Sequence, residues 1–170
     1  MSRPPGVQPE RYVDAAKCAH AELELARAFT LDALPRLQEA GAGARSTLAL
    51  ELRFLPFEQK TAVNGTLSGE LELVCQRCLR AVMVPLHEPF KLVLAADEAT
   101  LVQEFTDYET ILVDPTRLDL QWLAEEQGLL AMPLVARHEP GECGAGAPLP
   151  REDAGTQRPF GNLRDMLRNR

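Results

Sequence analysis

The chain has 170 residues, of which 45% are hydrophobic and 25% are charged. This length predicts one domain with an ordinary hydrophobic core, and this composition excludes a wholly disordered chain. No apolar run approaches the ~18 residues that a transmembrane helix needs, and the start of the chain has no hydrophobic signal core. Four cysteines are too few for a disulfide scaffold. We therefore expect a cytoplasmic protein with reduced thiols and no membrane partner.

The net charge of −7 is unevenly distributed along the chain. Residues 97–126 hold nine acidic residues and one basic residue, whereas residues 151–170 hold five arginines and three acidic residues. Nucleic-acid-binding proteins usually carry a broad basic surface, because phosphate contacts dominate their affinity. The charge pattern therefore argues against broad duplex binding. It leaves open a local basic patch or a basic protein partner.

The first part of the chain predicts short elements. Residues 1–10 contain three prolines and are expected to form a loose tail. The alanine-rich segment 12–21 predicts a short helix, and the even spacing of apolar side chains over residues 23–29 favours a strand. A second short helix is predicted over residues 31–37, ended by Gly41.

The hydrophobic period changes to two over residues 48–54, which predicts a strand with one buried face. Asn64-Gly65 is the strongest short turn signal and predicts a hairpin turn before a strand over residues 67–73. Residues 82–94 are also typical of a strand, although two prolines restrict them to an edge strand or to two short strands. The centre of the chain therefore predicts an antiparallel meander of three to five strands.

The rest of the domain is expected to be mostly loop and helix. Residues 96–110 predict an acidic loop, and residues 111–113 a short strand. Thr116 and Asp119 form a variant of the capping box that begins a helix running to Pro133. Together the elements predict an α+β fold, in which helices pack against an antiparallel sheet.

We predict one α+β domain over residues 1–138. Residues 139–159 contain four glycines and four prolines and predict a flexible linker. The linker tethers a basic C-terminal helix or tail over residues 160–170. The helical spacing of Phe160, Leu163 and Leu167 would give this segment an apolar face, which docks either on a partner or on its own domain.

The Cys75-Gln76-Arg77-Cys78 segment is the sharpest chemical feature. Two cysteines separated by two residues can bind one tetrahedral ion, because the intervening turn brings both sulfurs towards a common centre. His138 and Cys143 offer a second half-site, with 59 residues between Cys78 and His138. Together the four residues would form a closed Cys3His site for a structural zinc ion, with no open position for water.

Two other interpretations of the cysteines remain open at this stage. They could simply pack as small apolar residues, or they could form a thiol–disulfide redox motif. The redox interpretation is weaker, because strand-like sequence flanks the motif where thioredoxin-like proteins have a helix N-terminus. The chain also has no nucleophile elbow, P-loop or GxGxxG motif. We therefore expect neither an enzyme nor a small-molecule substrate.

Four features in order resemble the YceD family, bacterial proteins linked to the accumulation of large-subunit ribosomal RNA. They are a strand leading into the cysteine pair (residues 71–82), an acidic helix followed by Met-Pro-Leu-Val (residues 119–138), a histidine followed closely by a cysteine, and a terminal Arg-Pro-Phe segment (residues 158–167). The resemblance implies a non-catalytic ribosome biogenesis factor that supports synthesis, processing or accumulation of 23S rRNA and assembly of the large subunit. By position, the family's marked residues here are Cys75, Cys78, His138, Cys143 and the Pro159-Phe160 pair.

Such a factor could meet its partner in two ways. Basic side chains could contact rRNA phosphates, and the candidates are Arg77, Arg80, Lys91 and Arg158. Alternatively, the acidic stretch could hold a basic ribosomal protein of the assembling large subunit without touching RNA. In either case Phe160, Leu163 and Leu167 are candidate partner-binding residues.

Overall fold

The structure is a computed structural model and describes residues 11–143. The chain divides between Arg137 and His138 into two compact units. The predicted helix or tail at residues 160–170 lies outside the described residues, as do residues 144–159 of the predicted linker. The domain boundaries expected from the sequence therefore stay a prediction.

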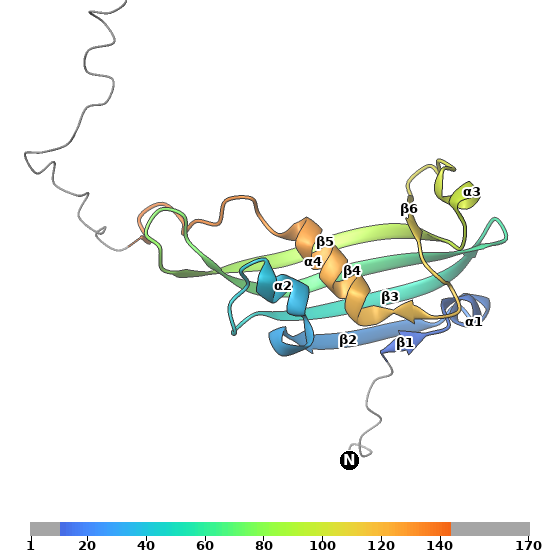
Figure 1. Cartoon of the computed structure of the whole chain (residues 1–170), viewed down its shortest axis with the longest axis horizontal. Coiled ribbons are helices and arrows are strands. Elements are labelled where there is room, and N and C mark those ends of the chain that lie inside the picture. The colour runs from blue at the N-terminus through green and yellow to red at the C-terminus, as the bar shows by residue number, and fades with distance from the viewer. Residues whose placement is uncertain (1–10, 144–170) are drawn as a thin grey trace, which may run out of the picture. The chain divides into compact units, whose positions relative to one another are not determined.

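The described residues form seven strands and four α-helices, with one short 3-10 helix (Figure 1). The strands are β1 (Tyr12–Val13), β2 (Glu24–Thr30), β3 (Thr47–Phe57), β4 (Lys60–Val74), β5 (Ala81–Ala95), β6 (Glu109–Leu112) and β7 (Leu118–Asp119). The helices are α1 (Ala15–His20), η1 (Leu31–Ala33), α2 (Pro35–Glu39), α3 (Glu98–Leu101) and α4 (Leu120–Ala131).

A five-stranded sheet in the order β2-β3-β4-β5-β6 is the centre of the fold. The first four strands are antiparallel neighbours, and β6 pairs with β5 in parallel. Helices α2 and α4 lie over one face of this sheet, and β1 pairs with β7 in a separate two-stranded sheet (Figure 1). The predicted α+β fold, with helices packed on a largely antiparallel sheet, is confirmed.

The hydrophobic core lies between the sheet and its helices. Side chains alternate between the two faces of a strand, so four large apolar residues of β3 at every second position point to one side. Leu48, Leu50, Leu52 and Phe54 are at most 3% exposed. Glu51 and Arg53, which alternate with them, are exposed on the opposite face. The period-two pattern of the sequence thus decides which face of the sheet receives the helices.

Helix α4 is fixed at its start and along its length. Its N-cap is Asp119 and not Thr116, so the helix begins later than the predicted capping box implied. Asp119 accepts hydrogen bonds from the backbone N–H groups of Gln121 and Trp122 at 3.0 and 3.1 Å. One turn further on, the buried Glu125 accepts a hydrogen bond from the backbone N–H of Arg36 on α2 at 2.7 Å. These bonds satisfy polar groups at two helix N-termini, which fixes α4 in register with α2.

The predicted turn at Asn64-Gly65 is wrong, because both residues lie in the middle of β4. The hairpin turn between β3 and β4 is instead Glu58-Gln59, where both residues have positive φ angles, 46° and 63°. Gly65 has a different role, since a Cβ atom there would lie 2.2 Å from the ring of Phe90. The glycine lets an aromatic side chain of β5 cross the neighbouring strand.

Three further expectations need correction. Residues 81–95 form one continuous strand rather than two short ones, and both prolines lie in its first part, which is an open edge as the other alternative predicted. The predicted acidic loop contains α3 and the beginning of β6. The strand after this loop pairs in parallel with β5, so the sheet is not wholly antiparallel. Parallel pairing became possible because residues 96–108 carry the chain back along the sheet before β6 begins.

Candidate metal centre

The first half of the candidate site is the tip of the β4–β5 hairpin. Residues 75–80 connect the two strands, and the backbone N–H of Cys75 donates to the carbonyl of Arg80 at 2.9 Å. The N–H of Leu79 returns to the carbonyl of Cys75, also at 2.9 Å, with Leu79 in the left-handed region at φ 58°. These bonds close a tight turn between the two cysteines. The side chain of Cys75 is fully buried, and that of Cys78 is partly exposed.

The chain after α4 passes beside this hairpin tip. The backbone N–H of Gln76 donates to the carbonyl of Ala136 at 2.9 Å. Pro133 ends the helix and leaves residues 132–136 without helical hydrogen bonds, so they can approach the sheet. This contact explains how a residue just beyond Ala136 can be near the cysteine pair in space although about 60 residues lie between them in the sequence.

The second half of the candidate site is a short turn over residues 138–143. The backbone N–H of Glu142 donates to the carbonyl of Glu139 at 3.1 Å, and Gly141 has a φ of 95° that favours glycine. Within this turn the Cys143 sulfur lies 3.7 Å from Nδ1 of His138. An imidazole nitrogen and a thiol are therefore presented side by side.

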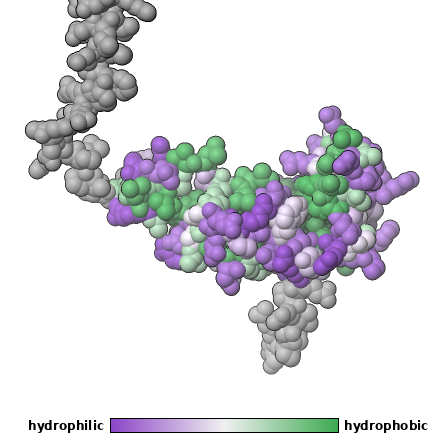
Figure 2. Space-filling view, in the orientation of Figure 1, coloured by the Kyte–Doolittle hydropathy of each residue, from purple (hydrophilic) through white to green (hydrophobic). Residues whose placement is uncertain are grey.

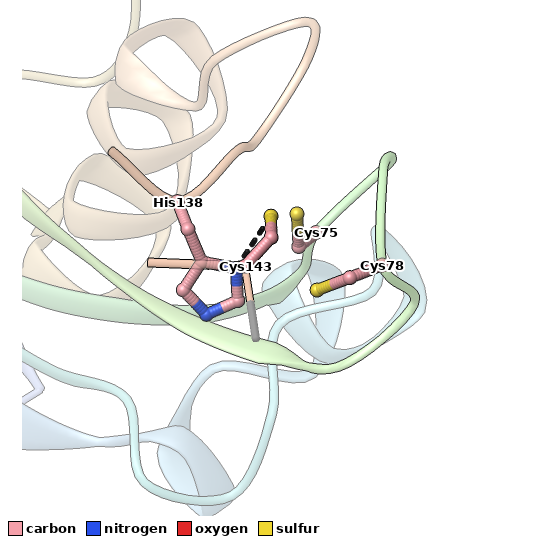
Figure 3. A group of neighbouring side chains, drawn as sticks. All are labelled: Cys75, Cys78, His138 and Cys143. Atoms are coloured by element: carbon pink, nitrogen blue, oxygen red, sulfur yellow. Dashed lines mark hydrogen bonds between the residues drawn. The ribbon is translucent and has the colours of Figure 1, made fainter. Parts of the chain in front are cut away.

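The structure brings the four predicted ligands together. One ligand atom from each of Cys75, Cys78, His138 and Cys143 lies within 4.8 Å of all the others, and Figure 3 shows the three sulfurs and the imidazole arranged around a common point. Two sulfurs bound at 2.3 Å to one tetrahedral ion are about 3.8 Å apart. None of the four cysteines of the described chain is in a disulfide. The donor set and its spacing therefore suit a tetrahedral metal ion.

The remaining cysteine is outside this cluster. Cys18 lies on α1, and burial, followed by the charge of Asp14, raises the pKa of its thiol. A raised pKa means less thiolate at neutral pH and weaker metal affinity. Cys18 is therefore a natural internal control for experiments on the other three thiols.

The structure does not group the predicted basic residues. Arg77 and Arg80 are exposed at the hairpin tip, whereas Lys91 is eleven residues further along β5, roughly 35 Å from Arg80 at the rise of a strand. The Lys91 ammonium lies 5.9 Å from the centroid of the Tyr108 ring. Arg158, Phe160, Leu163 and Leu167 lie outside the described residues.

The cysteine pair has none of the surroundings of a thioredoxin-like site. It lies in a turn between two antiparallel strands, and no helix of the described chain begins at Cys75 or Cys78. The dipole of a helix N-terminus, which lowers the thiol pKa in such enzymes, is therefore missing from the motif itself. The redox interpretation is not favoured.

Comparison with known proteins decides the family. The model of the YceD family, described as large ribosomal RNA subunit accumulation protein YceD, matches residues 63–165. The chain belongs to the YceD family. A YceD protein of Haemophilus influenzae, a large ribosomal RNA subunit accumulation protein, is 28% identical over 172 aligned positions, which cover 91% of this chain and 93% of the relative. No solved structure matches the chain.

The YceD match extends over the entire candidate metal centre, over β5 and α4, and over β4 from Val63 onward. The resemblance inferred from four ordered sequence features is thereby confirmed. No helix among residues 11–143 has the length and apolar character needed to cross a membrane.

Proposed function

We propose that this protein is a non-catalytic ribosome biogenesis factor in the cytoplasm, which supports synthesis, processing or accumulation of 23S rRNA and assembly of the large subunit. The observation that carries the proposal is the YceD family match over residues 63–165, together with a relative of nearly the same length whose name refers to accumulation of the large ribosomal RNA subunit. Its partners are then rRNA or ribosomal proteins of the assembling subunit, and it has no small-molecule substrate.

The same proposal gives Cys75, Cys78, His138 and Cys143 a structural zinc ion. Three thiolates and one imidazole are preferred ligands of Zn²⁺, and four protein ligands leave no coordination position for water or substrate. Zinc held in this way acts as a cross-link rather than a Lewis acid, because it ties the turn at residues 138–143 to the hairpin tip. This structural role agrees with a factor that performs no chemistry.

Two exposed arginines at the hairpin tip are the best candidates for contact with RNA. Arg77 and Arg80 flank Cys78, so a bound ion would hold their backbone in one conformation. A fixed backbone lowers the entropy lost when long cationic side chains bind phosphates. The tip would thus present two positive charges from a rigid base.

Depletion of the protein from its own cells tests the proposed function. We expect sucrose gradients to show fewer free and mature large subunits, with a lower ratio of 23S to 16S rRNA, and a plasmid copy of the gene to restore both. The Cys75→Ser, Cys78→Ser double variant should restore them poorly, whereas Cys18→Ser should restore them fully. Unchanged gradients and an unchanged rRNA ratio after depletion would contradict the proposal.

A further inference from the structure

A second candidate site lies beside the middle of β5, at residues 88–91, away from the hairpin tip. Here β5, β6 and the C-terminal part of α4 surround a depression of about 780 Å³. None of the four candidate metal ligands contributes to it. Its lining residues are Glu88, Pro89, Phe90, Lys91, Phe105, Asp107, Tyr108, Glu109, Gln127, Leu130 and Ala131. We call this depression the β5 groove.

One side of the β5 groove is an open strand edge. Strand β6 pairs only with Leu92–Ala95, so no described strand covers residues 81–91 of β5 on that side (Figure 1). Pro85 and Pro89 interrupt this edge and are both exposed. Proline offers no N–H group, and prolines on an edge strand discourage pairing with a further strand. A partner in the groove would therefore be held by side chains rather than by strand addition.

The apolar side chains of the groove are not buried in the hydrophobic core. Leu130 is 69% exposed on α4, whereas Leu120 and Leu123 of the same helix are at most 1% exposed. Phe90 is partly exposed next to it in the groove. Figure 2 shows hydrophobic residues gathered around β6 and near the end of α4. An exposed leucine beside partly exposed aromatic rings is typical of a protein-binding surface.

The polar part of the groove is negatively charged. Glu88, Asp107 and Glu109 face one positive charge, that of Lys91. Among the described residues, none of these three carboxylates forms an ion pair or a hydrogen bond through its side chain, and all three are exposed. Phosphate groups would be repelled here, whereas lysine and arginine side chains would be attracted.

Most of the other acidic residues of the stretch 97–126 already have partners within the fold. Asp97, Asp114 and Asp119 accept hydrogen bonds from backbone N–H groups at the beginning of helices or turns. Glu125 and Glu126 both bind Arg36. The acidic charge that remains for a partner is therefore concentrated at the β5 groove and the adjoining loop.

We propose that the β5 groove binds a segment of another protein that contains both basic and apolar side chains. Arginine or lysine residues of that segment pair with Glu88, Asp107 and Glu109, and an apolar residue packs against Leu130 and Phe90. Under the proposed function, on which the nature of the partner rests, the segment belongs to a basic protein of the assembling large subunit. The groove and the hairpin tip then serve different partners, one basic and one anionic.

A photoreactive amino acid in place of Leu130, introduced into the full-length protein in cells, tests this proposal. We expect crosslinks to a protein segment rich in lysine and arginine, identified by mass spectrometry. The same amino acid in place of Leu134, which is fully exposed outside the groove, is the control for a non-specific exposed position. Crosslinks from position 130 to RNA, to a second copy of this chain or to an acidic segment would overturn the proposal.

Charge reversal provides a matched comparison. The triple variant Glu88→Lys, Asp107→Lys, Glu109→Lys should reduce crosslinking from position 130 at least about tenfold, because like charges face each other across the contact. The control Glu39→Lys, Glu51→Lys, Glu70→Lys changes the net charge equally at exposed positions outside the groove and should leave crosslinking within about twofold of the original. Equal loss in both variants would contradict a specific groove.

A defined probe separates the groove from the cellular function. A fluorescent 12-residue peptide of arginine and leucine should bind the purified full-length chain, and the groove variant should weaken binding at least about fivefold relative to the control variant. If this holds while depletion leaves ribosomes unchanged, the groove proposal stands and the proposed function fails. If depletion impairs large subunits while the groove variant changes neither peptide binding nor crosslinking, the proposed function stands and the groove proposal fails.

Discussion

At the scale of single residues, Gly65 shows how an aromatic side chain on one strand can require a glycine on the neighbouring strand. The residue lies in the middle of β4, opposite Phe90 of β5, and the ring occupies the space that a Cβ atom would need. Asparagine-glycine is a strong turn signal because both residues tolerate positive φ. Here the backbone of β4 continues through them, so the glycine serves close packing rather than chain reversal.

We expect Gly65→Ala to lower the free energy of unfolding by about 1–3 kcal/mol, because the new methyl group would overlap the Phe90 ring. Urea denaturation of the purified chain measures the change. Adding Phe90→Leu should recover part of the loss, since a smaller side chain leaves room for the methyl group. Strictly additive losses in the double variant would show that the two residues do not compete for space.

The carboxylate of Asp119 is expected to make the stability of the fold depend on pH. Burial raises the pKa of this carboxyl, but hydrogen bonds from Arg11 and from the N–H groups of Trp122 and Gln121 outweigh burial and lower the pKa overall. A carboxylate with a lowered pKa stabilises the fold above its unfolded pKa of about 3.9, and the stabilisation is lost as the pH falls through the folded value.

Asp119→Asn keeps an N-cap side chain and removes the charge. We expect this variant to be less stable than the original by about 1 kcal/mol at pH 7, with the difference decreasing as the pH falls through the lowered pKa of Asp119 in the folded protein. Urea titrations at pH 7 and at acidic pH, with Glu39→Gln as the control for an exposed acidic residue, measure it. An equal difference at both pH values would mean that the lost cap geometry, not the lost charge, causes the effect.

At the scale of structural elements, the β3–β4 hairpin has a turn whose residues, Glu58 and Gln59, are not typical turn residues. Glu58 and Gln59 both have positive φ, which side chains other than glycine and asparagine disfavour. The hairpin forms because the long paired strands on either side of the turn outweigh this local cost. A turn decided by its strands cannot be found from the turn residues alone.

Replacing the turn by Glu58→Asn, Gln59→Gly should therefore stabilise the protein by about 0.5–1 kcal/mol, since both new residues adopt positive φ more easily. Thermal and urea unfolding measure the gain. Gln59→Ala is the opposite control and should give no gain, because alanine keeps the strained backbone. A loss of stability in the double variant would indicate that the original side chains make contacts that outweigh the strain.

The second prediction at the scale of elements is that the hairpin tip and the turn over residues 138–143 bind a zinc ion together. Purified full-length protein should contain about one zinc ion per chain, and Cys78→Ser should lose it and lower the midpoint of thermal unfolding by at least ~5 °C. Cys18→Ser should retain the metal. Titration with a thiol reagent should modify one cysteine, Cys18, before a chelator is added and all four cysteines afterwards. If the original protein contains no metal and Cys78→Ser has an unaltered melting temperature, the cysteines are simple packing residues.

At the scale of the whole molecule, a chain with a net charge of −7 has separated its surface charges. Exposed arginines lie at the hairpin tip, and unpaired carboxylates lie at the β5 groove, further along β5. Under the two proposals above, this separation would let one protein bind an anionic and a cationic partner at once. A net charge summed over the whole chain does not describe such local patches.

The Arg77→Gln, Arg80→Gln double variant tests the anionic side of this arrangement. We expect weaker binding to all fragments of 23S rRNA, and a slope of log affinity against log salt that is smaller by about 1 to 1.5, because two phosphate contacts are lost. Lys17→Gln with Arg53→Gln removes two exposed charges elsewhere and should leave the slope unchanged. An unaltered slope in the first variant would place RNA contact outside the tip.

The sequence alone was sufficient for the family, the α+β class, the strands β2 and β3, the helices α1 and α4 and the four metal-ligand candidates. Each of these depends on local periodicity, on residue types typical of helix ends, or on the chemistry of individual side chains. Only the tertiary structure decided the parallel pairing of β6, the role of Gly65, the β5 groove and the clustering of the ligand atoms. These features arise from contacts between residues far apart in the chain, and such contacts leave no periodic signal in the segments that make them.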